Sequence, residues 1–283
     1  MFYRMLAINI DGTLLRSNGR LQKGVKEAIE FVKRRGIYIT LVTNRNFPSA
    51  KKVAKALKID SLLVTHGGGF IASSVDSPII DLRISEEKTF NLVQVLENFD
   101  CNVRLLHERY SLGNRVHLQN NMVARAVIET GDPLFYPMQF VEFLGDSLRD
   151  VPVSTPKIDV YFSDKEELER ARTTIEQAFD GIHIYSDHPL RFDIVTEQVS
   201  KSQGLELLGK HLGIEMSEMV VIGDSYSDLP MIQKAGLGVA MGNSPVDLKQ
   251  AAKWVTRSND QNGVTYMVLS HFRKQLSITQ LNK

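Results

Sequence analysis

Residues 6–15 of this chain read LAINIDGTLL, a segment that joins an apolar strand to a polar end. Residues 5–8 are apolar, whereas Asn9 and Asp11 stand two positions apart, the spacing that places both side chains on one side of an extended chain. In α/β proteins the chemistry lies at the carboxyl ends of parallel strands. Because Asp-Gly after a core strand is also an ordinary turn, the segment predicts a site only together with polar residues at other strand ends.

The composition narrows the classes of protein and partner. The 283 residues are enough for two domains, and a formal net charge of +1 gives no electrostatic reason to expect a nucleic acid or an anionic membrane as partner. A single cysteine, Cys101, excludes an intrachain disulfide and fits a reducing compartment. No apolar run approaches the length of a membrane span, and the N-terminus lacks a signal-peptide pattern. We expect a cytoplasmic protein, either a monomer or a weak dimer.

Strands and helices alternate at both ends of the chain. The pattern of strand, helix, strand, helix and strand over residues 5–65 predicts right-handed crossovers and a parallel sheet, and it returns near residue 193. Ser244-Pro245 predicts a helix start with serine as the N-cap. The expected strands of this sheet lie at residues 5–8, 37–42, 62–65, 219–222, 237–240 and 254–256.

The pattern differs between these two parts, so the fold class is α/β with an inserted module. We assign residues 1–82 and 193–283 to a core with a mostly parallel sheet, and residues 83–192 to an inserted α/β domain. A capping box at residues 163–166 predicts one helix start in the insert. The other elements expected there are strands at 103–107 and 158–162, a helix at about 118–128, and two strands flanking 187–189.

Polar residues occur at four strand ends or helix starts of the predicted core. A hydroxyl and an ammonium group bind phosphate oxygens, and carboxylates hold Mg²⁺, which prefers oxygen ligands. Taken singly, Lys201 is an ordinary solvated lysine at a helix start and Asp224 an ordinary turn or cap residue. Their joint occurrence in one array of strands and helices favours a site for phosphate and a divalent cation. The four groups are Asn9 with Asp11, Thr43-Asn44-Arg45, Lys201, and Asp224 with Asp228.

These motifs resemble those of a known enzyme family. In order along the chain, NIDGT at 9–13, Thr43, Lys201 and the pair Asp224 and Asp228 are similar to the four motifs of haloacid-dehalogenase-like phosphatases. The Cof-type subfamily is echoed by SKS at 200–202 and GVAMGN at 238–243. The resemblance covers nearly the whole chain. It implies a Rossmann-like core and, at residues 83–192, a mobile α/β cap domain over the active site.

The resemblance also implies roles for individual residues. In that family an aspartate at the position of Asn9 attacks phosphorus and forms an aspartyl-phosphate, while the residue matching Asp11 protonates the leaving group and then activates water. Charge stabilisation of the transferring phosphoryl group is a major part of such catalysis. The implied catalytic residues are Asn9, Asp11, Thr43 and Lys201. The implied Mg²⁺ ligands are Asn9, Asp11 through its carbonyl, Asp224 and Asp228. The implied substrate contacts are Gly12, Thr13, Thr43, Asn44, Arg45, Lys201 and Asn243.

The chain departs from the family pattern at the nucleophile. An amide oxygen is a far weaker nucleophile than a carboxylate, and the loss of charge at Asn9 also weakens the cation site. For scale, removal of a serine-protease nucleophile lowers kcat by about 10⁶-fold. Gly67 and Asn44 also differ from the residues common in Cof-type chains. Asn9 is either a natural loss or an engineered substitution, and a deamidation to aspartate is disfavoured by the bulky Ile10 that follows.

The sequence therefore agrees with two alternative functions. The first is a Mg²⁺-dependent phosphatase, a hydrolase of small phosphorylated metabolites, impaired by Asn9. The second is an inactive pseudoenzyme that still binds a phosphorylated ligand and has a sensory, regulatory or stress-related role. A sugar-phosphate mutase ranks last, because it needs the same missing aspartate. Substrate specificity would lie in the cap, where His107 and His188 are candidates, although a lone histidine is more often structural or solvated.

Overall fold

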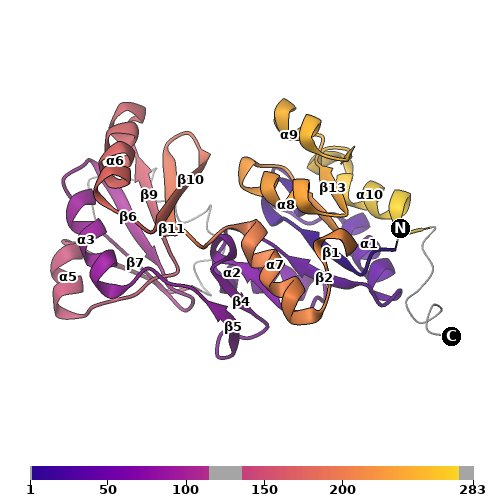
Figure 1. The fold of residues 1–283 in the computed structure, drawn as a ribbon, viewed down its shortest axis with the longest axis horizontal. Coiled ribbons are helices and arrows are strands. Elements are labelled where there is room, and N and C mark those ends of the chain that lie inside the picture. The colour runs from indigo at the N-terminus through magenta and orange to yellow at the C-terminus, as the bar shows by residue number, and fades with distance from the viewer. Residues whose placement is uncertain (1, 115–135, 274–283) are drawn as a thin grey trace. The chain divides into compact units, whose positions relative to one another are not determined.

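The computed structural model describes residues 2–114 and 136–273, which form two compact units (Figure 1). The first unit takes in the chain up to residue 44, residues 50–73 and the chain from residue 200; the second takes in residues 45–49 and 74–199. The domain boundaries at 82/83 and 192/193 stay a prediction. Strand β11 (Arg191–Thr196) lies in the second unit, where it pairs with another strand of that unit. The helix expected at 118–128 lies outside the described residues.

A parallel sheet of five strands organises the first unit. Its order is β14-β13-β12-β1-β2, and every neighbouring pair is parallel. Strand β1, which lies between β12 and β2, is buried along its whole length, which explains its uninterrupted apolar sequence. In register, Ile8 lies opposite Leu41 on one side and Ile222 on the other, so the ends of these strands coincide. The bounds are β1 Met5–Ile8, β2 Tyr38–Leu41, β12 Met219–Gly223, β13 Leu237–Ala240 and β14 Trp254–Val255.

Amphipathic helices cover this sheet. In α1 (Lys23–Lys33) the buried residues Val25, Ala28, Ile29 and Val32 recur at helical spacing, so one stripe faces the core. Helix α1 packs against α10, and α7 packs against α8. The expected serine N-cap at Ser244 is wrong: the helix starts at Val246 and no side chain caps it. The remaining bounds are α2 Phe47–Ala56, α7 Lys201–Leu212, α8 Leu229–Lys234, α9 Val246–Ala251 and α10 Gly263–His271, with the antiparallel strands β3 Leu63–Thr65 and β4 Phe70–Ala72.

The second unit has a six-stranded sheet with helices packed on it. The strand order is β10-β11-β9-β6-β7-β8, and all the neighbouring pairs are antiparallel except β7 with β8. Alternate residues of β6 and β9 enter one hydrophobic core with the helices, for example Val103 and Val160. The strands are β6 Cys101–Leu106, β7 Ser111–Asn114, β8 Met138–Val141, β9 Lys157–Phe162, β10 Ile182–His188 and β11; β5 Pro78–Asp81 precedes them.

Side chains cap two helices of the second unit, and one of these caps tests the capping box predicted from the sequence. The helices are α3 Glu86–Leu96, α5 Leu144–Asp150 and α6 Lys165–Ala178. Ser85 caps α3 by accepting from the Lys88 backbone N–H at 3.3 Å. The capping box expected at 163–166 is wrong in detail, because Asp164 alone caps α6, accepting from the Glu167 N–H at 2.9 Å. No helix in the described part of the chain is both long and apolar enough to cross a bilayer.

Candidate active site

The turn after β1 brings Asn9 and Thr13 to Asp224. This turn spans Ile10–Leu14, and its backbone is not helical at Asp11 and Gly12. A similar turn, not helical at Gly67, lies at His66–Gly68, and 3-10 turns lie at Met216–Glu218, Tyr226–Asp228 and Asn259–Gln261. Gly12 has φ of +67°, and a Cβ at this position would lie 2.0 Å from Asp224 Oδ2. Glycine is therefore required both by the backbone conformation and by the close approach. Thr13 Oγ1 donates to Asp224 Oδ1 at 2.7 Å.

The Asn9 side chain is buried and joins three groups. Its Nδ2 donates to the Asp11 carbonyl oxygen at 2.8 Å and to Asp224 Oδ1 at 2.9 Å. At the other end of the amide, Oδ1 accepts from Lys201 Nζ at 3.4 Å. Acceptors thus surround the nitrogen and a donor faces the oxygen, so the partners fix the orientation of the amide. The Asp11 side chain itself is exposed.

Lys201 is a buried lysine at the start of α7. It is 3% exposed, and its Nζ lies 2.8 Å from Oδ1 of Asp228, which is fully buried. The alternative of a solvated lysine at a helix start is therefore wrong. Ser200 caps the helix, accepting from the Gln203 N–H at 3.1 Å. Gly68, with φ of +111°, allows its loop to approach this helix start, since a Cβ there would lie 2.1 Å from the Ser200 carbonyl oxygen.

Asp228 acts as a clamp on the turn after β12. While its Oδ1 accepts from Lys201, its Oδ2 accepts from the backbone N–H groups of Asp224 at 2.9 Å and of Ser225 at 3.1 Å. The Ser225 hydroxyl donates to the same oxygen at 3.2 Å, and these two residues form a reciprocal capping box. Both carboxylate oxygens of Asp228 are thus engaged in holding Asp224 and Lys201 in place.

Asp224 is the electrostatic centre of this cluster. Burial, and then the nearby charge of Asp228, raise the pKa of Asp224 to about 7. The hydrogen bond from Thr13, the charge of Lys201 and the hydrogen bond from Asn9 oppose that rise in pKa. The cluster therefore holds two neighbouring carboxyl groups against one ammonium group, with neutral donors supplying the remaining stabilisation.

The other predicted site residues follow β2 or β13 in the chain. Thr43 is buried two residues after the end of β2, and its backbone N–H donates to the Val64 carbonyl at 2.9 Å. Asn44 Nδ2 donates to Ser227 Oγ at 3.4 Å. Asn243, which follows β13, donates to the Gly12 carbonyl at 2.9 Å. Arg45 belongs to the residues of the second unit, where its Nη1 donates to Ser49 Oγ at 3.0 Å.

The structure thus joins five of the predicted side chains in one hydrogen-bonded cluster: Asn9, Thr13, Lys201, Asp224 and Asp228. The catalytic, metal and substrate roles assigned to them stay predictions. Sequence reasoning missed Ser225 and Asn259, whose backbone N–H donates to Asn243 Oδ1 at 3.0 Å. The run SYSD at 225–228 has the Ser-x-x-Asp spacing of a capping box, and that signal could have identified Ser225.

The geometry tests whether these residues suit the implied Mg²⁺. The ion requires oxygen ligands in near-octahedral geometry. At Asn9, however, the nitrogen and not the oxygen faces Asp224 and the Asp11 carbonyl. Both oxygens of Asp228 already accept hydrogen bonds, and no three His, Cys, Asp or Glu side chains within residues 2–114 and 136–273 are grouped as metal ligands. In this arrangement the residues do not fit a magnesium ion.

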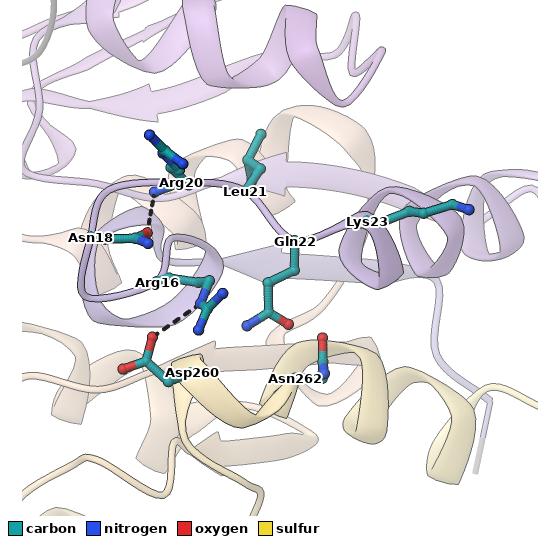
Figure 2. A pocket seen from close by; sticks show the side chains of 8 residues that line it. All are labelled: Arg16, Asn18, Arg20, Leu21, Gln22, Lys23, Asp260 and Asn262. Atoms are coloured by element: carbon teal, nitrogen blue, oxygen red, sulfur yellow. Dashed lines mark hydrogen bonds and ion pairs between the residues drawn. The ribbon is translucent and has the colours of Figure 1, made fainter.

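A surface pocket of about 410 Å³ lies elsewhere in the first unit (Figure 2). Figure 2 shows Arg16 turned toward Asp260, with Nε 3.3 Å from Oδ1, while Lys23 extends away from this pair. None of its eight lining residues belongs to the predicted site. The pocket is open and polar, so we place the candidate active site at the cluster around Asp224 instead.

Comparison with known proteins identifies relatives along the whole chain. The family model of haloacid dehalogenase-like hydrolases matches residues 6–268. Stress response protein YhaX of Bacillus subtilis is 50% identical over 275 residues, covering 97% of this chain and 95% of YhaX. Phosphatase YwpJ of the same bacterium is 27% identical over 282 residues, covering 94% and 98%.

A solved structure supports the fold. A haloacid dehalogenase-like hydrolase from Bacteroides thetaiotaomicron matches with a TM-score of 0.82 at 22% identity, over 95% of this chain and 99% of that one. Together with the family match, it confirms the resemblance and the α/β fold class with a Rossmann-like, mostly parallel core and a cap domain.

Proposed function

Since this chain belongs to the haloacid dehalogenase-like hydrolases, we propose that it binds a small phosphorylated metabolite and hydrolyses phosphate monoesters very slowly or not at all. One observation carries the proposal. Asn9 occupies the nucleophile position, and its amide is held from both ends, by Asp224 and the Asp11 carbonyl at the nitrogen and by Lys201 at the oxygen.

The chemistry of Asn9 supports slow hydrolysis. A neutral amide oxygen that accepts from an ammonium group is a poor nucleophile toward phosphorus, and attack by it would not yield the stable acyl phosphate that a carboxylate forms. Loss of a nucleophile lowers kcat by up to about 10⁶-fold in other enzymes. The remaining residues, Asp11 as general acid and base, and Thr43 and Lys201 as phosphate contacts, keep the roles that the resemblance implies.

Ligand binding is supported by the groups that the site retains. Lys201 brings a buried positive charge, and Thr43 follows β2 at the end of the sheet where Asn9 and Asp224 lie. The neutral Asn9 also removes one negative charge that would repel a phosphate anion. Gly12, Thr13, Asn44, Arg45 and Asn243 complete the proposed substrate-binding set.

The name of one relative favours the second function, a sensory or regulatory role without hydrolysis. The relative that is 50% identical over nearly the full length bears the name stress response protein, whereas the relatives named phosphatases that we compared are more distant. We infer a sensory or stress-related role in which binding of the phosphorylated ligand, and not its hydrolysis, is the event that matters. The proposal includes a cytoplasmic location and a monomer or weak dimer, with no nucleic acid or membrane as partner.

Calorimetric titration with inorganic phosphate, beside an aryl phosphate hydrolysis assay, tests this function. We expect Thr43→Ala to weaken phosphate binding about tenfold, because one hydrogen bond to a charged group contributes about this factor to an affinity. Thr40→Ala is the matched control, because the Thr40 hydroxyl donates to the Leu62 carbonyl at 2.8 Å within the sheet. It should lower stability and leave phosphate affinity unchanged. Absence of phosphate binding, or rapid hydrolysis by the unaltered chain, would refute the proposal.

A further inference from the structure

The arrangement around Asn9 resembles that of a bound cation. The Asn9 amide nitrogen sits between two oxygens, the Asp11 carbonyl at 2.8 Å and Asp224 Oδ1 at 2.9 Å. One NH₂ group carries two N–H bonds that diverge in a plane, so each can serve one of these acceptors. A positively polarised group therefore occupies the position between oxygens that in the absence of donors would repel each other.

We propose that the Asn9 amide takes the place of a divalent cation in this chain. The site is then assembled without Mg²⁺, and it binds its phosphate ligand without Mg²⁺. This ligand part rests on the proposed function, whereas the part that concerns the metal does not.

The orientation of the amide supports this substitution. Rotation by 180° would place Oδ1 against Asp224 Oδ1 and the Asp11 carbonyl, and it would place Nδ2 against the Lys201 ammonium. Each of these contacts would then pair two acceptors or two donors. A Mg²⁺ ion could use the Asn9 oxygen only after this rotation, and it would also have to displace both N–H bonds from the oxygens it binds. Cation binding and the observed hydrogen bonds are therefore mutually exclusive.

The charges near Asp224 support it as well. Lys201 lies 2.8 Å from Asp228 and neutralises it, and Asp224 receives its donors from Thr13 and Asn9. An aspartate in place of Asn9 would add a carboxylate beside Asp224 and would remove the donor to the Asp11 carbonyl. Two adjacent carboxylates need an added cation, because like charges at this separation disfavour the ionised state. The asparagine removes that need.

Thermal unfolding with and without the metal tests the proposal. We expect the melting temperature of the unaltered chain to be the same in EDTA and in about 10 mM Mg²⁺, since a ligand that does not bind cannot stabilise. Asn9→Asp should melt lower in EDTA and recover several degrees with Mg²⁺. Asn259→Asp is the matched control: its buried Nδ2 donates to the Leu15 carbonyl at 2.9 Å, so it loses the same kind of hydrogen bond, and its melting should not respond to Mg²⁺.

Direct calorimetric titration of Mg²⁺ into the unaltered chain decides the matter even if Asn9→Asp fails to fold. A dissociation constant weaker than about 10 mM supports the proposal, and one below about 1 mM overturns it. A rise in melting temperature of the unaltered chain equal to that of Asn9→Asp overturns it too.

A third arm compares the affinity for inorganic phosphate in EDTA and in Mg²⁺. Affinities within about twofold support metal-independent binding, and a gain of about tenfold or more with Mg²⁺ overturns it. If phosphate binds under neither condition, the proposed function fails, and the magnesium titration still decides the role of Asn9.

Discussion

The buried ion pair between Lys201 and Asp228 should make a large contribution to the stability of the first unit. The two side chains are 3% and 0% exposed, and Nζ lies 2.8 Å from Oδ1. Removal of one partner from such a pair costs about 3–5 kcal/mol, because the other charge is left buried without compensation. In Asp228→Asn the amide oxygen can still accept from the backbone N–H groups of Asp224 and Ser225, but Nδ2 then faces the Lys201 ammonium, so we expect a cost within that range, about 3–5 kcal/mol.

Urea unfolding followed by the fluorescence of Trp254 measures this free energy. Trp254 is the only tryptophan in the chain and lies in β14, so its signal reports on the first unit. The midpoint should fall without a change of slope, which would indicate that the surface exposed on unfolding is unchanged. The matched control is Glu206→Gln, which breaks the Lys234–Glu206 pair with the short distance of 2.7 Å but side-chain exposures of 53% and 39%. It should cost less than about 1 kcal/mol.

A double-mutant cycle separates the pair from the rest of the cluster. Lys201→Met alone should also be destabilising, since it leaves the carboxylate of Asp228 buried beside Asp224. The double variant should cost at least about 1 kcal/mol less than the sum of the two single variants, because it leaves neither charge unpaired. If the two costs add, or if Asp228→Asn costs no more than the exposed control, the account of Asp228 as a clamp is wrong.

Two further predictions concern the close packing at Gly12 and the burial of Cys101. Gly12→Ala should lower the free energy of unfolding by about 3 kcal/mol, since the Cβ would meet Asp224 at a positive φ, whereas Gly19→Ala, also at positive φ but with nothing within 4 Å, should cost only about 1 kcal/mol in the same urea experiment. Cys101 is buried, and burial raises the pKa of its thiol to about 12, so we expect no reaction with an aromatic disulfide reagent at neutral pH until the protein is unfolded. A thiol that reacts at once in the native protein would contradict that assignment.

The periodicity of the sequence predicted the core because the signals there are local. A strand such as β1, buried on both sides, needs an unbroken apolar run, and the helix α1 needs a single apolar stripe, so both are visible in the chain itself. The convergence of strand ends follows from the parallel topology. The pairing of β11 with β9 could not be predicted, because it is a contact between distant segments, which no local pattern encodes.

The sequence predicted which residues form the site, but not how they hydrogen-bond to one another. The motif positions of Asn9, Lys201 and Asp224 were visible, but the direction of the Asn9 amide depends on which donors and acceptors surround it after folding. Likewise, the burial of Lys201 and the close approach of Gly68 to the start of α7 are visible only in the folded chain. The role of Asp228 in holding Mg²⁺ stays a prediction, and the sequence did not show that its oxygens accept from Lys201 and from two backbone N–H groups in the folded chain.

The central claim is that Asn9 alone prevents turnover in a site that is otherwise retained. The most direct measurement is hydrolysis of an aryl phosphate in the presence of Mg²⁺ by the unaltered chain, by Asn9→Asp, and by Asn9→Asp combined with Asp11→Asn. We predict no measurable turnover by the unaltered chain, a gain of about 10³-fold or more for Asn9→Asp, and a loss of that gain in the double variant, which lacks the general acid. Robust Mg²⁺-dependent turnover by the unaltered chain, or an Asn9→Asp variant that folds and remains inactive, would contradict the claim.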